Sequence, residues 1–314
     1  MENAGVSYLG VPLAPDKLEG PSTSLSFLGI ILDTERMEIM LPKDKLTRIQ
    51  QLLTTWLLRK KARKRQILSL VGTLQHATKD VRPGRAFVSR MYSMAAKLHE
   101  MHFITRLNTS FRSDLLWWHT FLQSWNGLGI LRHPTVSYLD FCAQTDASGA
   151  WGCAAVLDLQ WLQWQWPPEW YKIGIMAKEL VPIIFTCIVW GPYLSKHHIN
   201  FHCDNANLVI AINKGSSKDK FVMHLLRCLS FFVVHFDIYI TATHLPGVII
   251  VTADHLSRGR LDQAFQVTPT LSYQPTVIPH TAFQLIFPCR LDWISPHFLR
   301  LFHKTLSFIY RQSF

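Results

Sequence analysis

Four acidic residues lie in four distinct local sequences, each at the end of an apolar stretch. They are Asp146 in Gln-Thr-Asp-Ala-Ser, Glu179 in Ala-Lys-Glu-Leu, Asp204 in His-Cys-Asp-Asn and Asp254 in Thr-Ala-Asp-His-Leu. Carboxylate oxygens are hard ligands that suit Mg²⁺ or Mn²⁺. Two such ions, roughly 3.5–4 Å apart, can activate a water and stabilise the leaving oxygen of an in-line displacement. The four acids therefore predict a two-metal centre for cutting a phosphodiester.

The spacing of these acids also allows a plainer interpretation. Separations of 33, 25 and 50 residues define no motif. Unrelated surface acids, two of them at helix N-caps, would give the same pattern. Four carboxylates gathered without metal would repel one another, and at least one pKa would rise. Spacing alone leaves both interpretations open.

The elements that must position the acids follow a mixed pattern between residues 138 and 262. Apolar stretches predict strands at 138–144, 151–157, 159–166, 198–203 and 236–244, and helices at 177–190, 205–213, 221–234 and 252–258. This order predicts an α/β fold, a mixed sheet with helices against it. Asp146 and Asp204 would then end two strands, while Glu179 and Asp254 would each open a helix.

Three further regions flank this unit. Residues 1–42 contain two strand-like pieces, 26–33 and 37–41, that suggest a hairpin. Residues 43–134 carry apolar positions at helical spacing and predict four helices. Residues 263–314 are punctuated by prolines and are expected to be an irregular tail, with helical character only at its aromatic, basic end.

Composition restricts the partners and the compartment. Lys and Arg exceed Asp and Glu by 32 − 21 = 11, and 48% of residues are hydrophobic. The chain can therefore form a core, and its charge favours a polyanion, with nucleic acid ahead of an anionic membrane. No Cys-x-x-Cys pair, signal peptide or membrane-spanning stretch occurs. These features predict an intracellular protein with reduced cysteines and no membrane partner.

A basic run is the strongest candidate for contact with phosphates. It consists of Arg59, Lys60, Lys61, Arg63, Lys64 and Arg65. Such side chains can hold a nucleic-acid backbone in a salt-sensitive way. A solvated turn between helices is the alternative, and the run would also suit nuclear import.

Several other side chains have two interpretations. His244 could shuttle a proton beside the acids or be a histidine at a strand end. Asn205 could orient Asp204 or cap the following helix, and we favour the cap. Trp161, Trp164, Trp166 and Trp170 could stack on bases. Their alternation along a strand favours packing in the core instead.

Short sequences around the acids resemble the ribonuclease H domain of retroelement reverse transcriptases. They are Thr145-Asp-Ala-Ser148, Lys178-Glu-Leu180, Phe201-His-Cys-Asp-Asn205, Asn213-Lys-Gly-Ser-Ser-Lys218, His244-Leu-Pro-Gly247 and Ala253-Asp-His-Leu-Ser-Arg258. Within that group the chain most resembles DIRS-type elements, which use a tyrosine recombinase, and more distantly gypsy-like elements. Trp166-Pro-Pro-Glu-Trp170 and Met223-His-Leu-Leu-Arg-Cys228 strengthen the DIRS-type resemblance.

The resemblance extends towards the N-terminus and covers about residues 5–265. Gly20-Pro-Ser-Thr23 and Phe27-Leu-Gly-Ile30 resemble the last palm hairpin of such a polymerase. Leu41-Pro-Lys-Asp-Lys-Leu46, Ser69-Leu-Val-Gly-Thr-Leu74 and Val81-Arg-Pro-Gly-Arg85 resemble its thumb and connection. The implied domains are a palm remnant at 1–42, a helical thumb and connection at 43–134, a ribonuclease H-like domain at 138–262 and the tail at 263–314.

The resemblance implies an activity and its limits. Asp146, Glu179, Asp204 and Asp254 correspond to the family's metal-binding acids. The implied reaction is endonucleolytic cleavage of RNA in an RNA–DNA hybrid with two Mg²⁺ or Mn²⁺ ions. No Asp-Asp occurs in the chain, so an N-terminally truncated copy without polymerase activity is expected. A separate polymerase subunit or an intact element-encoded protein is a possible partner.

Departures from the family pattern keep two alternatives open. His255 replaces an alanine, and residues 249–252 lack the usual asparagine, which could misplace Asp254. A displacement of about an ångström can cost on the order of 100-fold in rate. A catalytically inactive nucleic-acid-binding remnant is therefore the first alternative. Strand transfer by a related fold is the second, and the Lys-Glu-Leu sequence and the polymerase-like N-terminal region disfavour it.

Overall fold

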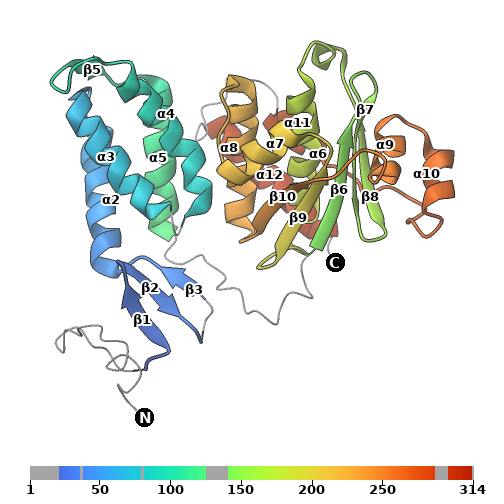
Figure 1. The fold of residues 1–314 in the computed structure, drawn as a ribbon, viewed down its shortest axis with the longest axis horizontal. Helices are drawn as coiled ribbons and strands as arrows, with labels where there is room; N and C mark the ends of the chain where they lie inside the picture. Colours follow the sequence, from blue (N-terminus) through green and yellow to red (C-terminus); the bar gives the residue numbers. More distant parts are fainter. Residues whose placement is uncertain (1–20, 36–37, 79–80, 125–140, 287–295, 313–314) are drawn as a thin grey trace, which may run out of the picture.

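The computed structural model describes residues 21–35, 38–78, 81–124, 141–286 and 296–312. Along the chain it forms a small N-terminal sheet, a group of helices and an α/β unit (Figure 1). The boundary predicted near residues 127–134 and the start of the first predicted strand, 138–140, lie outside the described residues.

The N-terminal sheet has three strands where the sequence predicts a two-stranded hairpin. Strands β1 (Ser24–Phe27), β2 (Ile30–Asp33) and β3 (Glu38–Met40) pair antiparallel. The stretch 26–33, expected as one strand, turns at Leu28 and Gly29, whose φ angles are 48° and 80°. Two consecutive positive φ values form the two-residue turn that matches strand twist, so this stretch is itself a hairpin.

Four helices follow, as the apolar spacing predicts. They are α2 (Lys43–Leu58), α3 (Lys64–Ala77), α4 (Arg85–Ala96) and α5 (Thr109–Ser124), with the short helix η2 (Arg82–Gly84) before α4. Residues Lys61–Arg63 form strand β4, paired with β5 (Ile104–Arg106). Part of the basic run is therefore a β-ribbon, not a simple turn. We refer to α2–α5 with this ribbon as the helical region.

A five-stranded sheet forms the centre of the α/β unit. Its strands are β6 (Phe141–Ala147), β7 (Gly152–Leu157), β8 (Gln160–Gln165), β9 (His198–Cys203) and β10 (Tyr239–His244). Their spatial order is β10-β9-β6-β7-β8. Strand β7 is antiparallel to both β6 and β8, whereas β9 is parallel to β6 and β10. This mixed sheet confirms the predicted ribonuclease H-like α/β fold.

Helices cover both faces of this sheet. They are α6 (Ile175–Val189), α7 (Ala206–Lys214), α8 (Lys220–His235), α9 (Val251–Ser257) and α10 (Leu261–Val267). Strand β7 is buried along its whole length, and alternate residues face opposite sides. Cys153 and Ala155 belong to the main core, whereas Ala154 and Val156 pack with Leu256 of α9. Helix α9 therefore lies on the face opposite the main core.

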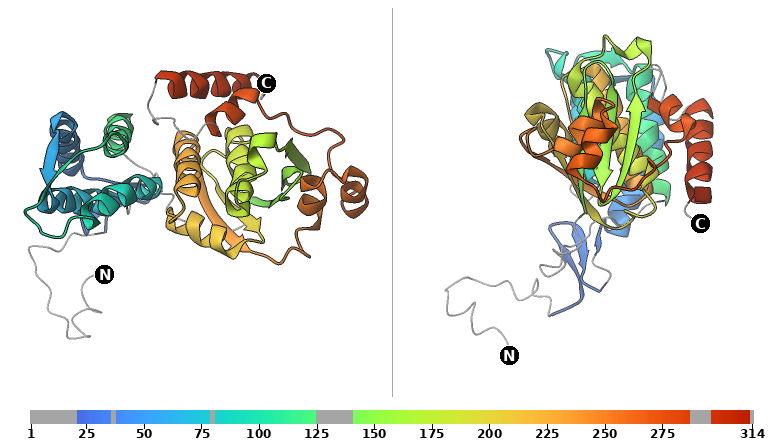
Figure 2. Two further views of the ribbon diagram at one scale, coloured as in Figure 1. Left: turned by 90° about the horizontal axis from the view of Figure 1, so that it is seen from above. Right: turned by 90° about the vertical axis from the view of Figure 1, so that its right-hand side faces the viewer.

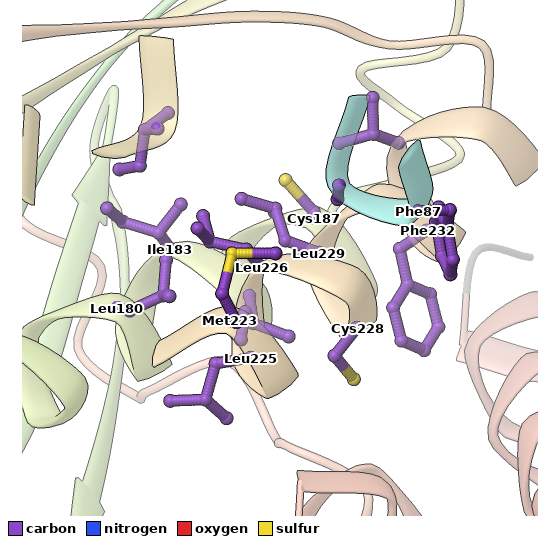
Figure 3. Close-up of a cluster of buried hydrophobic side chains, with 14 of the residues drawn as sticks. Phe87, Leu180, Ile183, Cys187, Met223, Leu225, Leu226, Cys228, Leu229 and Phe232 are labelled. Carbon is purple, nitrogen blue, oxygen red and sulfur yellow. The ribbon is translucent and has the colours of Figure 1, made fainter. Parts of the chain in front are cut away.

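The main core joins α6 and α8 (Figure 3). Leu180 and Ile183 of α6 pack with Leu226 and Leu229 of α8, and Phe87 of α4 belongs to the same cluster. Fully burying one such side chain stabilises the fold by about 1.5–3 kcal/mol. This apolar contact holds α6, and with it Glu179, against the sheet.

The C-terminal segment is more regular than the prolines predict. It contains α11 (His280–Ile286) and α12 (Pro296–Gln312), and both helices lie along the outside of the α/β unit (Figure 2). The ring of Phe302 lies 4.7 Å from that of Phe231 and 5.4 Å from that of Phe232. Aromatic side chains of α12 therefore pack on α8. The sequence after residue 263 has no regular pattern of strands and helices, so it did not predict this contact.

The cysteines and the apolar helices of the described residues bear on the expectations of reduced thiols and of no membrane-spanning stretch. Cys153, Cys187, Cys203 and Cys228 are buried free thiols, as expected for small apolar side chains, whereas Cys142 is exposed. No helix in the described ranges combines the length and apolar character needed to cross a bilayer.

Candidate metal centre

Asp146 is held on the central strand, facing helix α9. Ala143 and Ala147 of β6 lie in the main core, so the alternation of side chains directs Asp146 to the opposite face. Its carboxylate accepts a hydrogen bond from the hydroxyl of Ser257, and the residue is only 8% exposed. Asp146 is therefore an acid buried beside α9.

Glu179 and Asp204 meet beside the end of β9. The carboxylates of these two residues and the thiol of Cys203 offer ligand atoms that all lie within 4.8 Å of one another. The Cys203 thiol donates to Oε2 of Glu179 over 3.4 Å. Asn205 caps α7, since its side chain accepts from the backbone N–H groups of Asn207 and Leu208 at 3.1 Å. The favoured capping role of Asn205 is thus confirmed.

Asp254 approaches from α9. Its Oδ1 atom lies 2.7 Å from both Nε and Nη2 of Arg258, one helical turn further on. Ser257, between them in sequence, donates to Asp146 and contacts the Asp254 carbonyl at 2.9 Å. The departures from the family pattern near residues 249–255 therefore leave Asp254 on a helix that reaches Asp146.

The electrostatics place the four acids in one neighbourhood. Burial, followed by repulsion from Asp204 and Asp146, raises the pKa of Glu179 to about 7, although hydrogen bonds from Cys203 and Asn205 oppose the rise. Burial also raises the pKa of Asp146, and the charges of Asp204 and Asp254 add to this rise. Hydrogen bonding to Ser257 and the charge of Arg258 lower it.

These carboxyl groups fit a hard divalent cation. Glu179 and Asp146 are buried beside like charges, and ionisation in that setting is unfavourable without a counter-charge. The donor set is dominated by carboxylate oxygen, which suits Mg²⁺ or Mn²⁺. Cys203 adds one softer donor atom beside Glu179.

His244 lies next to Asp204. Its Nε2 atom is 3.1 Å from the backbone oxygen of Asp204, and the side chain is exposed. The following loop is also close, because a Cβ added to Gly247 would lie 3.4 Å from Oδ2 of Asp204. His244 is therefore at the edge of the acidic cluster, and its proposed catalytic role stays a prediction.

Three residues of this site, Cys203, Ser257 and Arg258, were not among the predicted site residues. Ser257 and Arg258 follow Asp254 by three and four positions, so a helical interpretation of 252–258 already places them on the same face. Cys203 directly precedes Asp204, and nothing in the local sequence distinguishes it from a core cysteine. Its contact with Glu179 depends on how α6 packs against β9.

The basic run lies elsewhere. Lys60, Lys61, Arg63 and Arg65 are exposed, on or beside the β4–β5 ribbon at the end of the helical region furthest from the sheet (Figure 1). Two members of the run have local partners. Lys64 donates to the backbone oxygens of Leu98 at 2.6 Å and His99 at 3.1 Å, and the Arg59 guanidinium lies 4.9 Å from the Trp56 ring centre.

The four tryptophans in β8 and just after it pack against other side chains. Trp161, Trp166 and Trp170 are 2%, 2% and 0% exposed, so they present no ring to a base. Trp164 is half-buried and stacks on Phe283 of α11 with ring centres 4.6 Å apart. The preferred interpretation of these residues as packing is confirmed.

Comparisons with known proteins give only structural likeness. No protein-family model matches the chain, and no curated protein matches it significantly. Similar solved structures include a foamy viral protease-reverse transcriptase with double-stranded DNA, at 13% identity and a TM-score of 0.32 over 71% of this chain. The same viral protein with an RNA/DNA hybrid matches at 11% identity and a TM-score of 0.30 over 70% of this chain.

The match spans less than half of those solved chains, 45% of the first and 29% of the second. At such TM-scores and identities the likeness indicates no activity or partner for this protein. The ribonuclease H-like assignment rests on the strand order and strand directions described above.

Proposed function

We propose that this protein is a metal-dependent ribonuclease H-type endonuclease that hydrolyses the RNA strand of RNA–DNA hybrids. The observation that carries the proposal is the set of four acids from β6, α6, the end of β9 and α9, whose charges act on one another. The residues quoted for the resemblance support a retroelement origin of the DIRS type.

Asp146, Glu179, Asp204 and Asp254 would hold the cations. Two bound Mg²⁺ or Mn²⁺ ions supply an activated water and stabilise the leaving oxygen of the RNA strand. Within the chain, Ser257 orients Asp146, Cys203 and Asn205 hold Glu179, and the Asp204 backbone accepts from His244. His244 is exposed at this edge and would exchange protons with solvent as product leaves.

The substrate follows from charge and from the helical region. A net charge of +11 favours a polyanion. We propose that residues 43–134 act as a thumb and connection platform, with Lys60, Lys61, Arg63 and Arg65 contacting phosphates and Arg59 and Lys64 bracing the ribbon. Residues 1–42 would be a palm-like hairpin region and 138–262 the nuclease, with α11 and α12 of the C-terminal tail on its outer side. The 2′-hydroxyl and the hybrid groove would distinguish RNA from DNA.

A cleavage assay tests the proposal. The full chain is incubated with an end-labelled RNA–DNA hybrid in Mg²⁺, and the expected result is RNA fragments that disappear with EDTA and with Asp204→Asn. Asp158→Asn is the matched control, since Asp158 is an exposed acid in the β7–β8 turn with φ 53°, a conformation that asparagine also tolerates. A folded wild-type chain that leaves the hybrid intact in Mg²⁺ and in Mn²⁺ contradicts the proposal.

One contact favours a second candidate function, hybrid binding without turnover. Arg258 engages Oδ1 of Asp254 through two nitrogens at 2.7 Å and so competes with a cation for that oxygen. Salt-sensitive hybrid binding with no fragments, together with cleavage restored by Arg258→Gln, would identify this candidate. Cleavage by the wild-type chain would exclude it.

A further inference from the structure

A buried ion triplet lies where the helical region meets the α/β unit. Asp114 of α5 is fully buried, and its carboxylate lies 3.3 Å from Nε of Arg90 on α4 and 3.6 Å from Nε of Arg227 on α8. Arg90 also donates to the Ser110 backbone oxygen at 3.1 Å, so it belongs to the helical region. Arg227 is therefore the guanidinium that crosses from the α/β unit.

Two sequence motifs that the metal centre does not use meet at this triplet. Val81-Arg-Pro-Gly-Arg85 forms η2 and the start of α4, and Met223-His-Leu-Leu-Arg-Cys228 lies on α8, which packs against both elements. The Arg227 guanidinium lies 5.9 Å from the Phe87 ring centre, and Phe87 stacks on Trp117 at 3.9 Å. Figure 3 shows Phe87 together with Phe232 and Cys228 of α8.

Helix η2, against which α8 packs, is itself held closely against α5. A Cβ added to Gly84 would lie 2.3 Å from the Trp118 ring, so only glycine lets η2 sit against α5. Trp118 is fully buried. The helical region therefore presents a closely packed side to α8, with the Asp114 carboxylate buried in it.

The charges at the junction depend on one another. Among the described residues, neither carboxylate oxygen of Asp114 has a hydrogen-bond partner, so the two guanidiniums are its main compensation. Burial raises the pKa of Asp114 to about 7, while Arg227 and Arg90 both favour the ionised form. Arg227 is itself only 3% exposed. Removing one member of such a set leaves a buried charge uncompensated, which is strongly destabilising.

We propose that Arg227 is a positioning residue, which pairs with Asp114 to fix the orientation of the helical region relative to the metal centre. The distance along the hybrid between the part bound by the helical region and the part at the acids would then be fixed. Cleavage would fall at a narrow set of positions. The cleavage part of this inference rests on the proposed nuclease function, whereas the fixed orientation does not.

The test compares Arg227→Gln with the wild-type chain at pH 8, where Asp114 is ionised. This variant removes the crossing guanidinium but leaves Arg90 with Asp114, so the helical region keeps its own ion pair. Arg311→Gln makes the same charge change on an exposed residue of α12 and is the matched control. Arg227→Lys keeps the charge without the planar fork and serves as the conservative variant.

Two readouts are needed, calorimetric unfolding and mapping of cleavage positions on an end-labelled hybrid. We expect one unfolding transition for the wild-type chain and Arg311→Gln, and two separated transitions for Arg227→Gln. Cleavage by Arg227→Gln should spread over at least twice as many positions, and Arg227→Lys should be intermediate in both readouts. If Arg227→Gln does not fold, Arg227→Lys is tested alone. Separated unfolding transitions and a wider spread of cleavage positions in this variant would support the inference, and wild-type behaviour in both would overturn it.

Two results would overturn the inference. One is an Arg227→Gln variant that unfolds in one transition at the wild-type midpoint. The other is an Arg227→Gln variant with two transitions but unchanged cleavage positions. If the wild-type chain cleaves nothing, the proposed nuclease function fails, and the calorimetric comparison still decides whether Arg227 fixes the orientation.

Discussion

Two parts of this molecule bury carboxyl groups, and they do so with opposite neighbours. At the metal centre, Asp146 and Glu179 are 8% and 6% exposed and lie beside other acids. At the junction of the helical region and the α/β unit, Asp114 is fully buried between two arginines. Burial by itself therefore does not distinguish a candidate site from a structural ion pair.

The sign of the neighbouring charge makes the distinction. An acid that is buried with arginines has its counter-charge within the fold, and its removal should weaken the fold. Glu179 is buried with acids and without a neighbouring cation, so its ionised form costs stability until a metal ion binds. Strongly perturbed acids of this second kind are candidates for function. The contrast predicts that similar substitutions act in opposite directions at the two places.

Neutralising an acid of the metal centre should give the largest change. We expect Glu179→Gln to reduce hybrid cleavage by ~10³-fold or more, corresponding to about 4 kcal/mol of transition-state stabilisation. The same variant should unfold at higher urea concentration than the wild-type chain in EDTA at pH 8. Glu169→Gln changes an exposed acid and should alter neither property. If Glu179→Gln is less stable than the wild-type chain in EDTA, the predicted difference between the metal centre and the junction is wrong.

Neutralising the acid at the junction should have the opposite effect on stability. We expect Asp114→Asn to lower the free energy of unfolding by about 3 kcal/mol, because Arg227 is left buried without its partner. Urea unfolding at pH 8 measures the change, and Glu100→Gln, an exposed acid of the helical region, is the control. Equal or greater stability of Asp114→Asn would show that the triplet does not hold the junction.

The pH dependence of stability should reveal the buried carboxyl group of Glu179. The pKa of Glu179 is about 7 in the folded chain, above its usual 4.5. Between these values the folded state keeps a proton that the unfolded state has released. The free energy of unfolding in EDTA should therefore fall as pH rises from 4.5 to 7, by on the order of 2 kcal/mol.

Urea titrations across this pH range measure the effect. Saturating Mg²⁺ should make the fall shallower, because a bound cation favours the ionised carboxylate. The Glu179→Gln variant provides the reference without this titrating group. If the free energy of unfolding changes with pH equally in the wild-type chain and in Glu179→Gln, then Glu179 is not the group that causes the change.

The smallest effect is expected at a supporting side chain. Ser257→Ala removes the hydrogen bond to Asp146, and loss of such a supporting contact typically weakens metal affinity about 10-fold. Calorimetric Mg²⁺ titration of the two chains gives the ratio. Ser230→Ala, which removes only a hydroxyl bonded to its own helix, should bind Mg²⁺ as the wild-type chain does.

Several features were predictable from local sequence. Each apolar stretch around Asp146, Asp204 and Asp254 forms the predicted type of element. Asn205 and the left-handed Gly215 mark the two ends of α7, because capping depends on a few adjacent residues. The hairpin turn at Leu28 and helix α11 were missed, whereas the helix expected at the aromatic, basic end of the chain is present as α12. The two missed features depend on backbone conformation or packing that periodicity does not encode.

The sequence by itself determined which residues form strands and helices, and which acids end or open those elements. These properties follow from side-chain periodicity and capping over a few residues. Only the tertiary structure decided that Cys203 contacts Glu179, that Ser257 reaches Asp146 and that Arg227 crosses to Asp114. Each of these contacts joins residues at least 24 positions apart, and the packing of helices on the sheet brings them together.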